Sequence, residues 1–354
     1  MTRHPIAAWY CSGSWNYQQD EEWKEAERKK REQEAPKPAQ PPPPAPQKAI
    51  VVGRFDPLHR GHQFLIEAAR GIAARTDVIV RVRPEDSVPG ALRLAWCREL
   101  YGDDRVHALE LAPPPDASPD EIAYWTHWAD GVRALVPDAD VLVASDPGAW
   151  RLADVMGIGF VLVDPHRLAV PISATQIRAD PLACWDFLSP PARGHYARRV
   201  CLIGAEGSGK TTLARALAER LGTAWVPEQA RVVAERRGGE LREVDLPALF
   251  AAQAACEDAL ARQANRVLVC DTDLRSLVLW AERLFGRCAD ELRARAAARE
   301  PYLYVVPEPL GALDPARRAF AAACDDAARR SGSRTLWVIG SVEERVEQVI
   351  AAMR

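Results

Sequence analysis

The sequence predicts a two-domain α/β protein in which each domain is built on a parallel sheet. At 354 residues and about 100 to 200 residues per domain, the chain is long enough for two cores. From residue 48 onward, apolar strand-like runs alternate with helical patterns, as a parallel sheet with crossover helices requires. Two unrelated phosphate-handling signatures, "GRFDPLHRGH" and "GAEGSGKTT", lie about 150 residues apart. We therefore expect two different domains, because no internal repeat links the two halves.

The expected strands follow one another in two groups of five. Those of the first group are "AIVVGRF" (49–55), "DVIVRV" (77–82), "VHALEL" (106–111), "DVLVAS" (140–145) and "GFVLVD" (159–164). Those of the second are "RVCLIG" (199–204), "TAWVP" (223–227), "RVLVCD" (266–271), "YLYVVP" (302–307) and "TLWVIG" (335–340). The intervening segments have helical periodicity, for example residues 61–75 and 119–136, and a last helix is expected over 341–354.

Composition divides the chain into an extension at 1–47, a first domain at 48–190 and a second domain at 198–354. Proline and glycine cluster between the domains in "SPPARGHYARR" (189–199), just before a strand. The extension combines a charged run with the proline-rich segment "PKPAQPPPPAP", which is typical of disorder or a semi-rigid spacer. Its three tryptophans, Trp9, Trp15 and Trp23, leave open a partner-binding element as the alternative to plain disorder.

Several classes of protein are disfavoured by composition. No apolar run approaches the ~18 to 20 residues of a membrane span, and the start resembles no secretory signal, so we expect a cytoplasmic protein without a membrane partner. The eight cysteines form no CxxC pair, which argues against a zinc site or a disulfide framework. A formal charge of -3 gives no reason to expect DNA binding. The sequence leaves the oligomeric state open, a homo-oligomer included.

The stretch "GAEGSGKTT" matches the phosphate-loop pattern G-x-x-x-x-G-K-[ST] between an apolar strand and a helix. Glycines allow the backbone to wrap a phosphate with its N–H groups inward. Lys210 is expected to reach the β- and γ-phosphates of ATP, and the hydroxyl of Thr211 to hold Mg²⁺. The predicted nucleotide-binding residues are Gly204, Gly207, Ser208, Gly209, Lys210, Thr211 and Thr212. A purely structural glycine turn is the weaker alternative.

Phosphoryl transfer also needs carboxylates at neighbouring strand ends. Asp271 and Asp273 follow "RVLVC", a Walker-B-like position for magnesium. Glu228 and Arg231 in "WVPEQAR" follow the strand after the phosphate-loop helix, and Glu228 is a candidate to accept a substrate proton or to hold a ribose. For each carboxylate taken singly, a helix-cap or salt-bridge role is the alternative. Together with the phosphate loop, they favour a small-molecule kinase.

The upstream signature places His59 and His62 where a strand ends and a helix begins. Without further ligands nearby, zinc is less favoured than an anion at the helix start. An imidazole there can stabilise charge that develops on a phosphate. "GRFDPLHRGH" matches the GxFxPxHxGH motif of nucleotidylyltransferases, and "PISATQIRAD" resembles their ISSTxxR element. The predicted nucleotide contacts of this half are Gly53, Arg54, Phe55, Ser173, Thr175 and Arg178.

Across residues 48–354 the chain resembles the NadR-type bifunctional nicotinamide-nucleotide adenylyltransferases and ribosylnicotinamide kinases. The matching elements are the two motifs above, "VLVDPHR", "PLACWDFL", the phosphate loop, "WVPEQAR" and "CDTDLRSLVLWAERLFG". The resemblance implies a Rossmann-like HxGH nucleotidylyltransferase domain followed by a P-loop kinase domain. It implies that the kinase converts nicotinamide riboside to the mononucleotide, with MgATP as co-substrate, and that the transferase adenylylates the mononucleotide to NAD and pyrophosphate.

The resemblance also implies roles for single residues. His59, His62, Lys210, Glu228 and Asp271 would be catalytic, and Thr211 with Asp271 would hold Mg²⁺. Arg231 and Asp273 would contact the riboside or magnesium, and Trp125 and Trp128 would stack on nicotinamide, with core packing as the alternative for the two tryptophans. In the short segment between the second and third strands, Arg93 is the one substrate-loop residue that carries over.

The chain departs from the family at two places. The 47 residues before the first strand are too few and too proline-rich for the helix-turn-helix repressor domain of some members, so we expect no operator binding. The family's Asp-Gly-x-Arg lid segment is replaced by "EPLGALDPARR" (308–318), where Arg317 or Arg318 would have to supply a catalytic charge. Two alternatives therefore stay open: a transferase–kinase fusion acting on another metabolite, and a nucleotide-sensing protein with a weakened lid.

Overall fold

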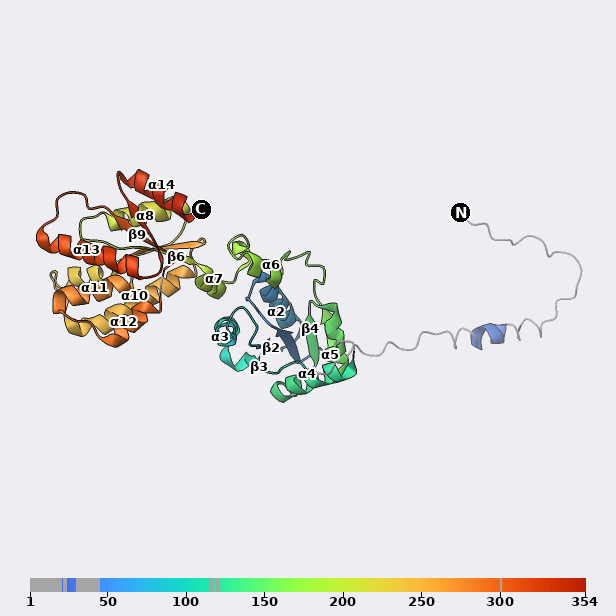
Figure 1. The fold of residues 1–354 in the computed structure, drawn as a ribbon. Coiled ribbons are helices and arrows are strands. Elements are labelled where there is room, and N and C mark those ends of the chain that lie inside the picture. The colour runs from blue at the N-terminus through green and yellow to red at the C-terminus, as the bar shows by residue number, and fades with distance from the viewer. Residues whose placement is uncertain (1–20, 22–23, 30–44, 115–117, 119–120, 300) are drawn as a thin grey trace, which may run out of the picture. The chain divides into compact units, whose positions relative to one another are not determined.

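The computed structural model describes residues 21, 24–29, 45–114, 118, 121–299 and 301–354 (Figure 1). The chain divides into two units, Met1–Ala45 and Pro46–Arg354. In the first unit the described residues 21 and 24–29 are helical. The predicted roles of the three tryptophans and of the proline-rich segment fall outside the described residues. The second unit holds two five-stranded sheets, both fully parallel.

The first sheet has the strand order β3-β2-β1-β4-β5, with β1 at its centre. Its strands are β1 Lys48–Gly53, β2 Arg75–Arg81, β3 Val106–Leu109, β4 Val141–Ala144 and β5 Gly159–Leu162. Its helices are α2 Arg60–Ile72, α3 Gly90–Tyr101, α4 Ile122–Leu135, α5 Trp150–Met156 and α6 Ala174–Ala179. Short 3-10 turns lie at Asp103–Arg105, Pro147–Ala149 and Trp185–Phe187.

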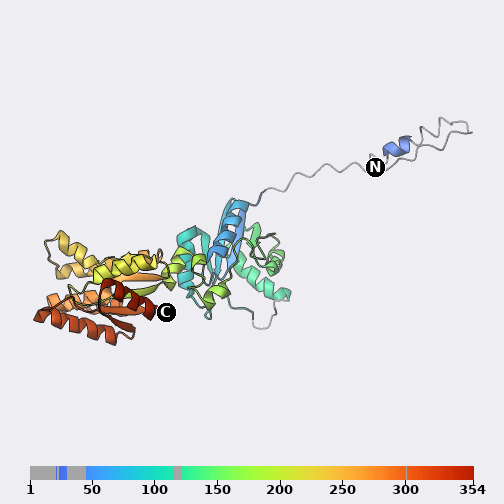
Figure 2. The same ribbon diagram turned by 90° about the horizontal axis from the view of Figure 1, so that it is seen from above.

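Alternating side chains of the central strand enter two different cores. Ile50 packs with buried residues of α4 and α5, whereas Ala49 and Val51 pack with those of α2 and α3. This is the pattern of a strand that is buried on both faces. Helices accordingly cover both faces of the sheet (Figures 1 and 2).

The second sheet has the order β10-β9-β6-β8-β7, with β6 at its centre. Its strands are β6 Arg198–Leu202, β7 Trp225–Val226, β8 Val267–Asp271, β9 Leu303–Pro307 and β10 Arg334–Val338. Its helices are α8 Lys210–Leu221, α9 Gln229–Arg236, α10 Leu246–Ala261, α11 Leu274–Phe285, α12 Asp290–Ala297, α13 Pro315–Arg330 and α14 Val342–Met353, with a 3-10 turn at Glu243–Asp245.

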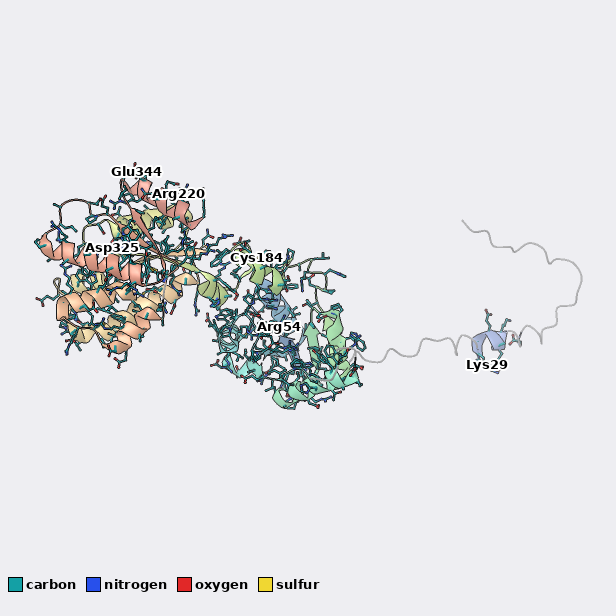
Figure 3. The ribbon with its side chains drawn as sticks, in the orientation of Figure 1. Lys29, Arg54, Cys184, Arg220, Asp325 and Glu344 are labelled. Atoms are coloured by element: carbon teal, nitrogen blue, oxygen red, sulfur yellow. The ribbon has the colours of Figure 1, made fainter. Side chains whose placement is uncertain are left out.

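One face of the second sheet packs on α8 and α14. Val200 and Leu202 of β6 meet Leu213 and Leu217 of α8 and Val349 of α14 there. Figure 3 shows Arg220 on α8 and Glu344 on α14, the two helices of this layer. The other face carries α10, α11 and α13. The predicted fold class, two parallel-sheet α/β domains, is confirmed.

The segment between the sheets is helical where the sequence indicates only a proline- and glycine-rich seam. Two prolines occupy the first turn of α7, Pro190–Tyr196, where a missing N–H costs no hydrogen bond. Just before it, the buried Trp185 donates its indole N–H to the carbonyl of Ala264 at 3.1 Å. Arg266 likewise donates to the carbonyl of Leu182 at 2.8 Å.

Two further expectations from composition can be compared with the structure. Cys97, Cys201, Cys270, Cys288 and Cys324 are buried free thiols, and Cys184 (Figure 3) and Cys256 are half-buried free thiols. Within the described part of the chain, no helix is both long and apolar enough to cross a bilayer.

Candidate functional site

The two histidines of the first signature lie together at the end of β1 and the start of α2. His59 is the N-cap of α2, and its Nδ1 accepts the N–H of Gly61 at 3.1 Å. Because Nδ1 accepts, the proton of a neutral His59 ring lies on Nε2. The ring of His62 stacks on His59 at 3.7 Å between centroids, and Phe55 meets His62 edge-on at 4.9 Å. A side chain at position 61 would lie 2.9 Å from the His59 ring, which explains the glycine.

The second signature is brought to the same place by α6. Ser173 caps this helix through a reciprocal capping box with Gln176. Arg178 donates to Thr175 Oγ1 at 3.2 Å and to the backbone carbonyl of Asp56 at 2.6 Å. A cavity of about 340 Å³ is lined by both signatures, including Arg54, Phe55, His59, His62, Ser173, Thr175 and Arg178. The structure thus places the six predicted nucleotide contacts of this half at one cavity or, for Gly53, at the end of the strand beside it.

Burial keeps the two histidines neutral in the ligand-free chain. It lowers the pKa of His59 to about 4, and the charge of Arg167 contributes to the shift. Burial also holds the pKa of His62 well below its usual range, with further contributions from His59 and Arg167. The Nδ1 atom of His62 is buried without a hydrogen-bond partner among the described residues. At neutral pH the pair can therefore donate N–H hydrogen bonds to phosphate without carrying charge.

Arg167 is a cavity residue to which the sequence analysis assigns no role, although it lies within "VLVDPHR". It lies on the loop after β5 and lines the cavity with both histidines. The carboxylate of Asp164 holds this loop by accepting the N–H groups of Leu168 at 2.7 Å, Ala169 at 3.1 Å and Val170 at 3.3 Å. Both Asp164 and Arg167 have left-handed backbones, with φ values of 48° and 53°. Such strain in a loop that presents a cation is typical of a ligand site.

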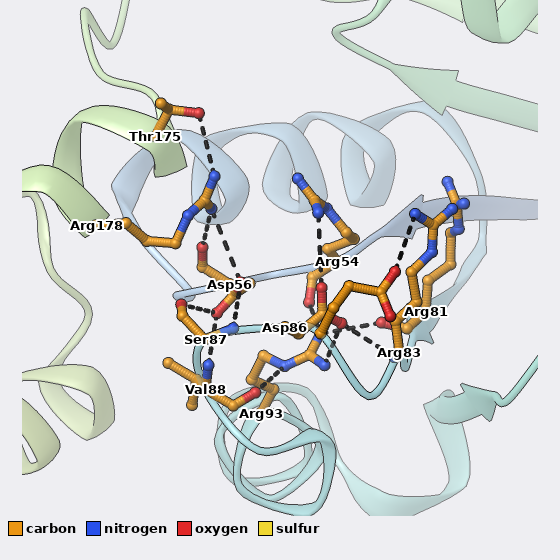
Figure 4. A network of polar contacts seen from close by, with 11 residues as sticks. Arg54, Asp56, Arg81, Arg83, Asp86, Ser87, Val88, Arg93, Thr175 and Arg178 are labelled. Atoms are coloured by element: carbon orange, nitrogen blue, oxygen red, sulfur yellow. Dashed lines mark hydrogen bonds and ion pairs between the residues drawn. The ribbon is translucent and has the colours of Figure 1, made fainter.

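A polar network holds the cavity wall in place (Figure 4). Asp56 is 2% exposed and accepts hydrogen bonds from Ser87 N, Ser87 Oγ and Val88 N at 2.8 to 3.1 Å. Burial alone would raise the pKa of Asp56, but these bonds and the charge of Arg93 hold it below its usual value. The side chain of Arg178 also lies 3.9 Å from the Asp56 carboxylate. The loop after β2 is thereby fixed against the HxGH segment.

Arg93 has a different position from the one predicted for a substrate-loop residue. Its side chain is fully buried, pairs with Asp86 at 2.6 Å and donates to the backbone carbonyls of Val88 at 2.8 Å and Arg81 at 3.0 Å. It also donates to the carbonyl of Arg54. Because it is fully buried and these contacts engage its nitrogens, Arg93 supports the loop after β2 from within the domain.

The two tryptophans predicted to stack on nicotinamide lie on α4. Trp128 is 4% exposed and packs in the core beneath the guanidinium of Arg81, at 3.9 Å from the ring centroid. This geometry favours the core-packing alternative for Trp128. Trp125 is half-buried beside Tyr124, at 5.3 Å between ring centroids.

In the second domain, the phosphate loop follows the central strand β6. Gly204, Gly207 and Gly209 have φ values of 155°, 78° and 83°, which only glycine adopts readily. The ammonium of Lys210 donates to the carbonyls of Gly204 and Ala205, both at 2.9 Å, so it lies folded back over the loop. Ser208 is buried and donates to Ala205 O at 2.9 Å, whereas Thr212 is exposed in the first turn of α8.

The next strand brings the Walker-B-like carboxylate to the loop. Thr211 Oγ1 donates to Asp271 Oδ2 at 2.5 Å and accepts a hydrogen bond from Arg231 at 3.0 Å. The other oxygen, Asp271 Oδ1, is buried and has no hydrogen-bond partner among the described residues. A hydroxyl and a free carboxylate oxygen at the phosphate loop suit Mg²⁺, which takes its remaining ligands from phosphate and water. In the described part of the chain, no group of three or more His, Cys, Asp or Glu residues forms a fully protein-bound metal site.

Glu228 lies beside the same loop. Together with Lys210, Arg231 and Trp280 it lines a cavity of about 460 Å³. Burial raises the pKa of Glu228, and Asp271 adds to the increase. Lys210 opposes it, as does Arg231, which pairs with Glu228 at 3.1 Å as in the salt-bridge alternative. A carboxylate with a raised pKa beside a phosphate loop suits proton acceptance from a hydroxyl. Trp280, to which the sequence analysis assigns no role, supplies the aromatic wall of this cavity and packs on Phe320 at 4.6 Å between centroids.

Asp273 is engaged by the fold on both oxygens. Its Oδ1 accepts from Ser276 N and Oγ at 2.9 and 3.0 Å as the N-cap of α11, and its Oδ2 accepts the phenol O–H of the buried Tyr304 at 2.5 Å. This geometry favours the helix-cap alternative for Asp273 over a substrate contact.

Fold and site geometry together define a protein of two parallel-sheet α/β domains, the first carrying the HxGH segment and the second the phosphate-loop motif. A family model described as an AAA domain matches residues 199–345. The chain is 28% identical over 265 residues to the trifunctional NAD biosynthesis/regulator protein NadR of Salmonella typhimurium, and 28% over 267 residues to that of Escherichia coli. These matches cover 67% of this chain and 63% of each relative, less than two thirds of the relatives' length.

Three further matches differ in how much of this chain they cover. Nicotinamide-nucleotide adenylyltransferase of Aeropyrum pernix is 26% identical over 175 residues, which is 44% of this chain and 93% of the relative. A crystal structure of NadR protein in complex with NAD and AMP-PNP has a TM-score of 0.70 at 21% identity, covering 87% of this chain and 95% of that one. A NadR structure in complex with NR gives 0.69 at 20% identity, covering 86% and 95%. The comparisons confirm the resemblance to the NadR type and its two-domain fold.

The buried histidines predict a loss of stability in mild acid. Because the folded-state pKa values of His59 and His62 lie below the ordinary value of 6.5, the unfolded chain binds more protons between about pH 6.5 and pH 4. The free energy of unfolding should therefore be fully present above about pH 6.5 and fall by about 1.4 kcal/mol per pH unit for each histidine as the pH is lowered through this range. Urea denaturation across this range measures the slope. The double variant His59→Asn/His62→Asn should have a shallower slope, and an unchanged slope in this variant contradicts the assignment.

Arg167 is predicted to act on both the histidines and the nucleotide. In Arg167→Gln, the pKa of His59 should rise above about 4, as followed by NMR of the ring protons, because a nearby positive charge is removed. ATP should bind this cavity about 10- to 100-fold more weakly through loss of one charged hydrogen bond. Arg151→Gln is the matched control, since Arg151 lies over Trp150 and outside the lining of the cavity. If the pKa of His59 and the affinity for ATP in Arg167→Gln equal those in the Arg151→Gln control, this role of Arg167 is ruled out.

Proposed function

We propose that the chain is a two-step enzyme of NAD synthesis. Its second domain would transfer the γ-phosphoryl group of ATP to nicotinamide riboside, and its first domain would join the resulting mononucleotide to the adenylyl group of a second ATP. The observation that supports the proposal is that one chain carries two separate segments with phosphate-binding motifs, at the cavity of His59 and His62 and at the loop of Lys210. The printed names of the similar proteins, which mention NAD biosynthesis, NAD, AMP-PNP and NR, suggest the substrates.

In the kinase step, the 5′-hydroxyl of the riboside attacks the γ-phosphorus of ATP, ADP leaves, and the hydroxyl proton is transferred to Glu228. The raised pKa of Glu228 suits this acceptor role. Lys210 would leave its carbonyl partners to contact the β- and γ-phosphates. Thr211 and Asp271 would hold Mg²⁺, which when bound neutralises charge on the phosphates. Trp280 offers a flat apolar wall for the riboside ring.

In the transferase step, a phosphate oxygen of the mononucleotide attacks the α-phosphorus of ATP, and pyrophosphate leaves. Arg178, Ser173 and Thr175 would hold the triphosphate, since they line the same cavity as the two histidines. His59 would donate from Nε2, because its Nδ1 is occupied by Gly61 N–H. Fixed N–H donors and cations around the departing phosphates stabilise the transition state without reorganisation.

The substrate assignment can be tested directly on the full chain. With MgATP, nicotinamide riboside should give the mononucleotide and ADP, and the mononucleotide should give NAD and pyrophosphate, as resolved by chromatography. Lys210→Ala should lower riboside phosphorylation by about 10²- to 10³-fold and leave NAD formation unchanged, because it removes one transition-state donor of the kinase site. His62→Ala should lower NAD formation by a similar factor and leave riboside phosphorylation unchanged, because it removes one donor of the transferase site. Absence of turnover with both acceptors would overturn the proposal in favour of another metabolite or a sensing role.

The lid provides a second test of the kinase assignment. Arg317 lies in the first turn of α13, and its Nε is 3.8 Å from the carboxylate of Glu206 in the phosphate loop. Arg318 instead donates to Leu313 O at 3.2 Å and lines a different cavity. We therefore expect Arg317→Ala to lower kcat for riboside phosphorylation by about 10²-fold or more, through loss of a cation near the transferring group, with little change in KM for the riboside.

Arg318→Ala is the matched control for this lid experiment and should retain most of the activity. Equal losses in the two variants would show that neither arginine acts on the transferring group and that both act through the folding of α13.

A further inference from the structure

Arg345 is a buried cation that neither the sequence motifs nor the proposed chemistry uses. It lies in the first turn of α14 and is 4% exposed. Its three nitrogens donate to three backbone carbonyls: Nε to Gly340 at 2.9 Å, Nη1 to Ser208 at 2.9 Å and Nη2 to Glu308 at 3.0 Å. Among the described residues it forms no ion pair with a carboxylate. A buried guanidinium satisfied by carbonyls alone is costly, so its presence at this position calls for a reason.

The three carbonyls belong to three loops at the carboxyl ends of neighbouring strands. Ser208 lies in the phosphate loop after β6, Glu308 begins the lid segment after β9, and Gly340 lies in the turn between β10 and α14. Ligands of parallel α/β sheets gather at this edge. The planar fork of arginine can hold three such acceptors at fixed angles, which a lysine cannot do.

The contact with Ser208 determines which way one peptide of the phosphate loop faces. In a trans peptide, the carbonyl of Ser208 and the N–H of Gly209 point in opposite directions. Arg345 holds that carbonyl outward, so the Gly209 N–H is directed to the inner side of the loop. Gly209 is also enclosed from outside, because a Cβ there would lie 3.4 Å from Leu310 and 3.8 Å from Arg345 Nη1, and its φ is 83°.

We propose that Arg345 is a positioning residue of the kinase site: it fixes the Ser208–Gly209 peptide so that the Gly209 N–H binds the β-phosphate of the nucleotide, and it ties the lid segment to the same peptide. This inference rests on the proposed P-loop kinase function and assigns the orientation of the loop to a residue more than 130 positions away. It also places a full positive charge directly behind the phosphate cradle.

The test compares nucleotides with and without a β-phosphate. Arg345→Met should weaken the binding of ADP to the phosphate loop by about 10- to 100-fold, the cost of a misdirected hydrogen bond to a charged group. Binding of AMP should change less than about 2-fold, because AMP has no β-phosphate. ADP and AMP binding are measured by calorimetry on the full chain carrying Arg178→Ala, a substitution chosen to suppress nucleotide binding in the cavity of the first domain. The further substitution Lys210→Ala gives the reference for lost nucleotide binding at the phosphate loop.

Three controls separate positioning from general stabilisation. Arg330→Met removes an exposed arginine of α13 that pairs with Asp326, and it should bind ADP like the parent chain. Arg345→Lys should be intermediate, since lysine keeps the charge and loses the fork. Added guanidinium, below concentrations that unfold the chain, should restore ADP binding to Arg345→Ala.

Two outcomes would overturn the inference: unchanged ADP affinity in Arg345→Met, or equal losses for ADP and AMP with no recovery in guanidinium. Neither depends on the acceptor, so they are distinct from failure of the proposed function. If the parent chain binds ADP normally but does not phosphorylate nicotinamide riboside, that result contradicts the proposed function and leaves the role of Arg345 intact.

Discussion

Both sites depend on one constraint, the parallel pairing of a central strand with neighbours that come later in the sequence. β1 lies between β2 and β4, and β6 lies between β9 and β8. At such a position, the crossover connections leave to opposite sides of the sheet and open a crevice at the carboxyl end of the strand. Each phosphate-binding segment is the first loop after its central strand. The HxGH segment and the phosphate loop therefore occupy equivalent places on two unrelated sheets.

The sequence predicts the parts of the sites that are local, because a short motif sets its own geometry. His59, Gly61 and His62 form one turn of chain, and their arrangement follows from the helix that begins there. The same holds for the glycines of the phosphate loop and for the capping box at Ser173. The alternation of strands and helices likewise predicts both sheets, since buried parallel strands leave a strong apolar signal. The second strand of the kinase-type domain is shorter than expected, only Trp225–Val226.

The sequence does not predict the residues whose partners lie far along the chain. Arg167 lies within the matching segment "VLVDPHR", but no motif assigns it a role, and Arg345 lies in no motif. The importance of both follows from the cavity and the carbonyls that they meet. For the same reason, the sequence suggests ligand roles for two residues, Arg93 and Asp273, whose side chains the fold itself engages. Arg93 lies in a predicted loop region, but its charge is satisfied in the interior by Asp86 and backbone carbonyls. Asp273 follows a strand as a Walker-type acid would, yet the fold engages both its oxygens.

The two candidate phosphate sites draw their positive charge from differently placed side chains. At the first, burial keeps His59 and His62 neutral, so the cavity gains its positive charge from Arg54, Arg167 and Arg178 at its margin. At the second, the cations are hydrogen-bonded to the loop itself, because Lys210 donates to the carbonyls of Gly204 and Ala205 and Arg345 donates to that of Ser208. Buried carbonyls that face away from a phosphate need donors on their outer side. A distant arginine meets this need and adds charge of the right sign, which links the last helix of the chain to the geometry of its phosphate loop.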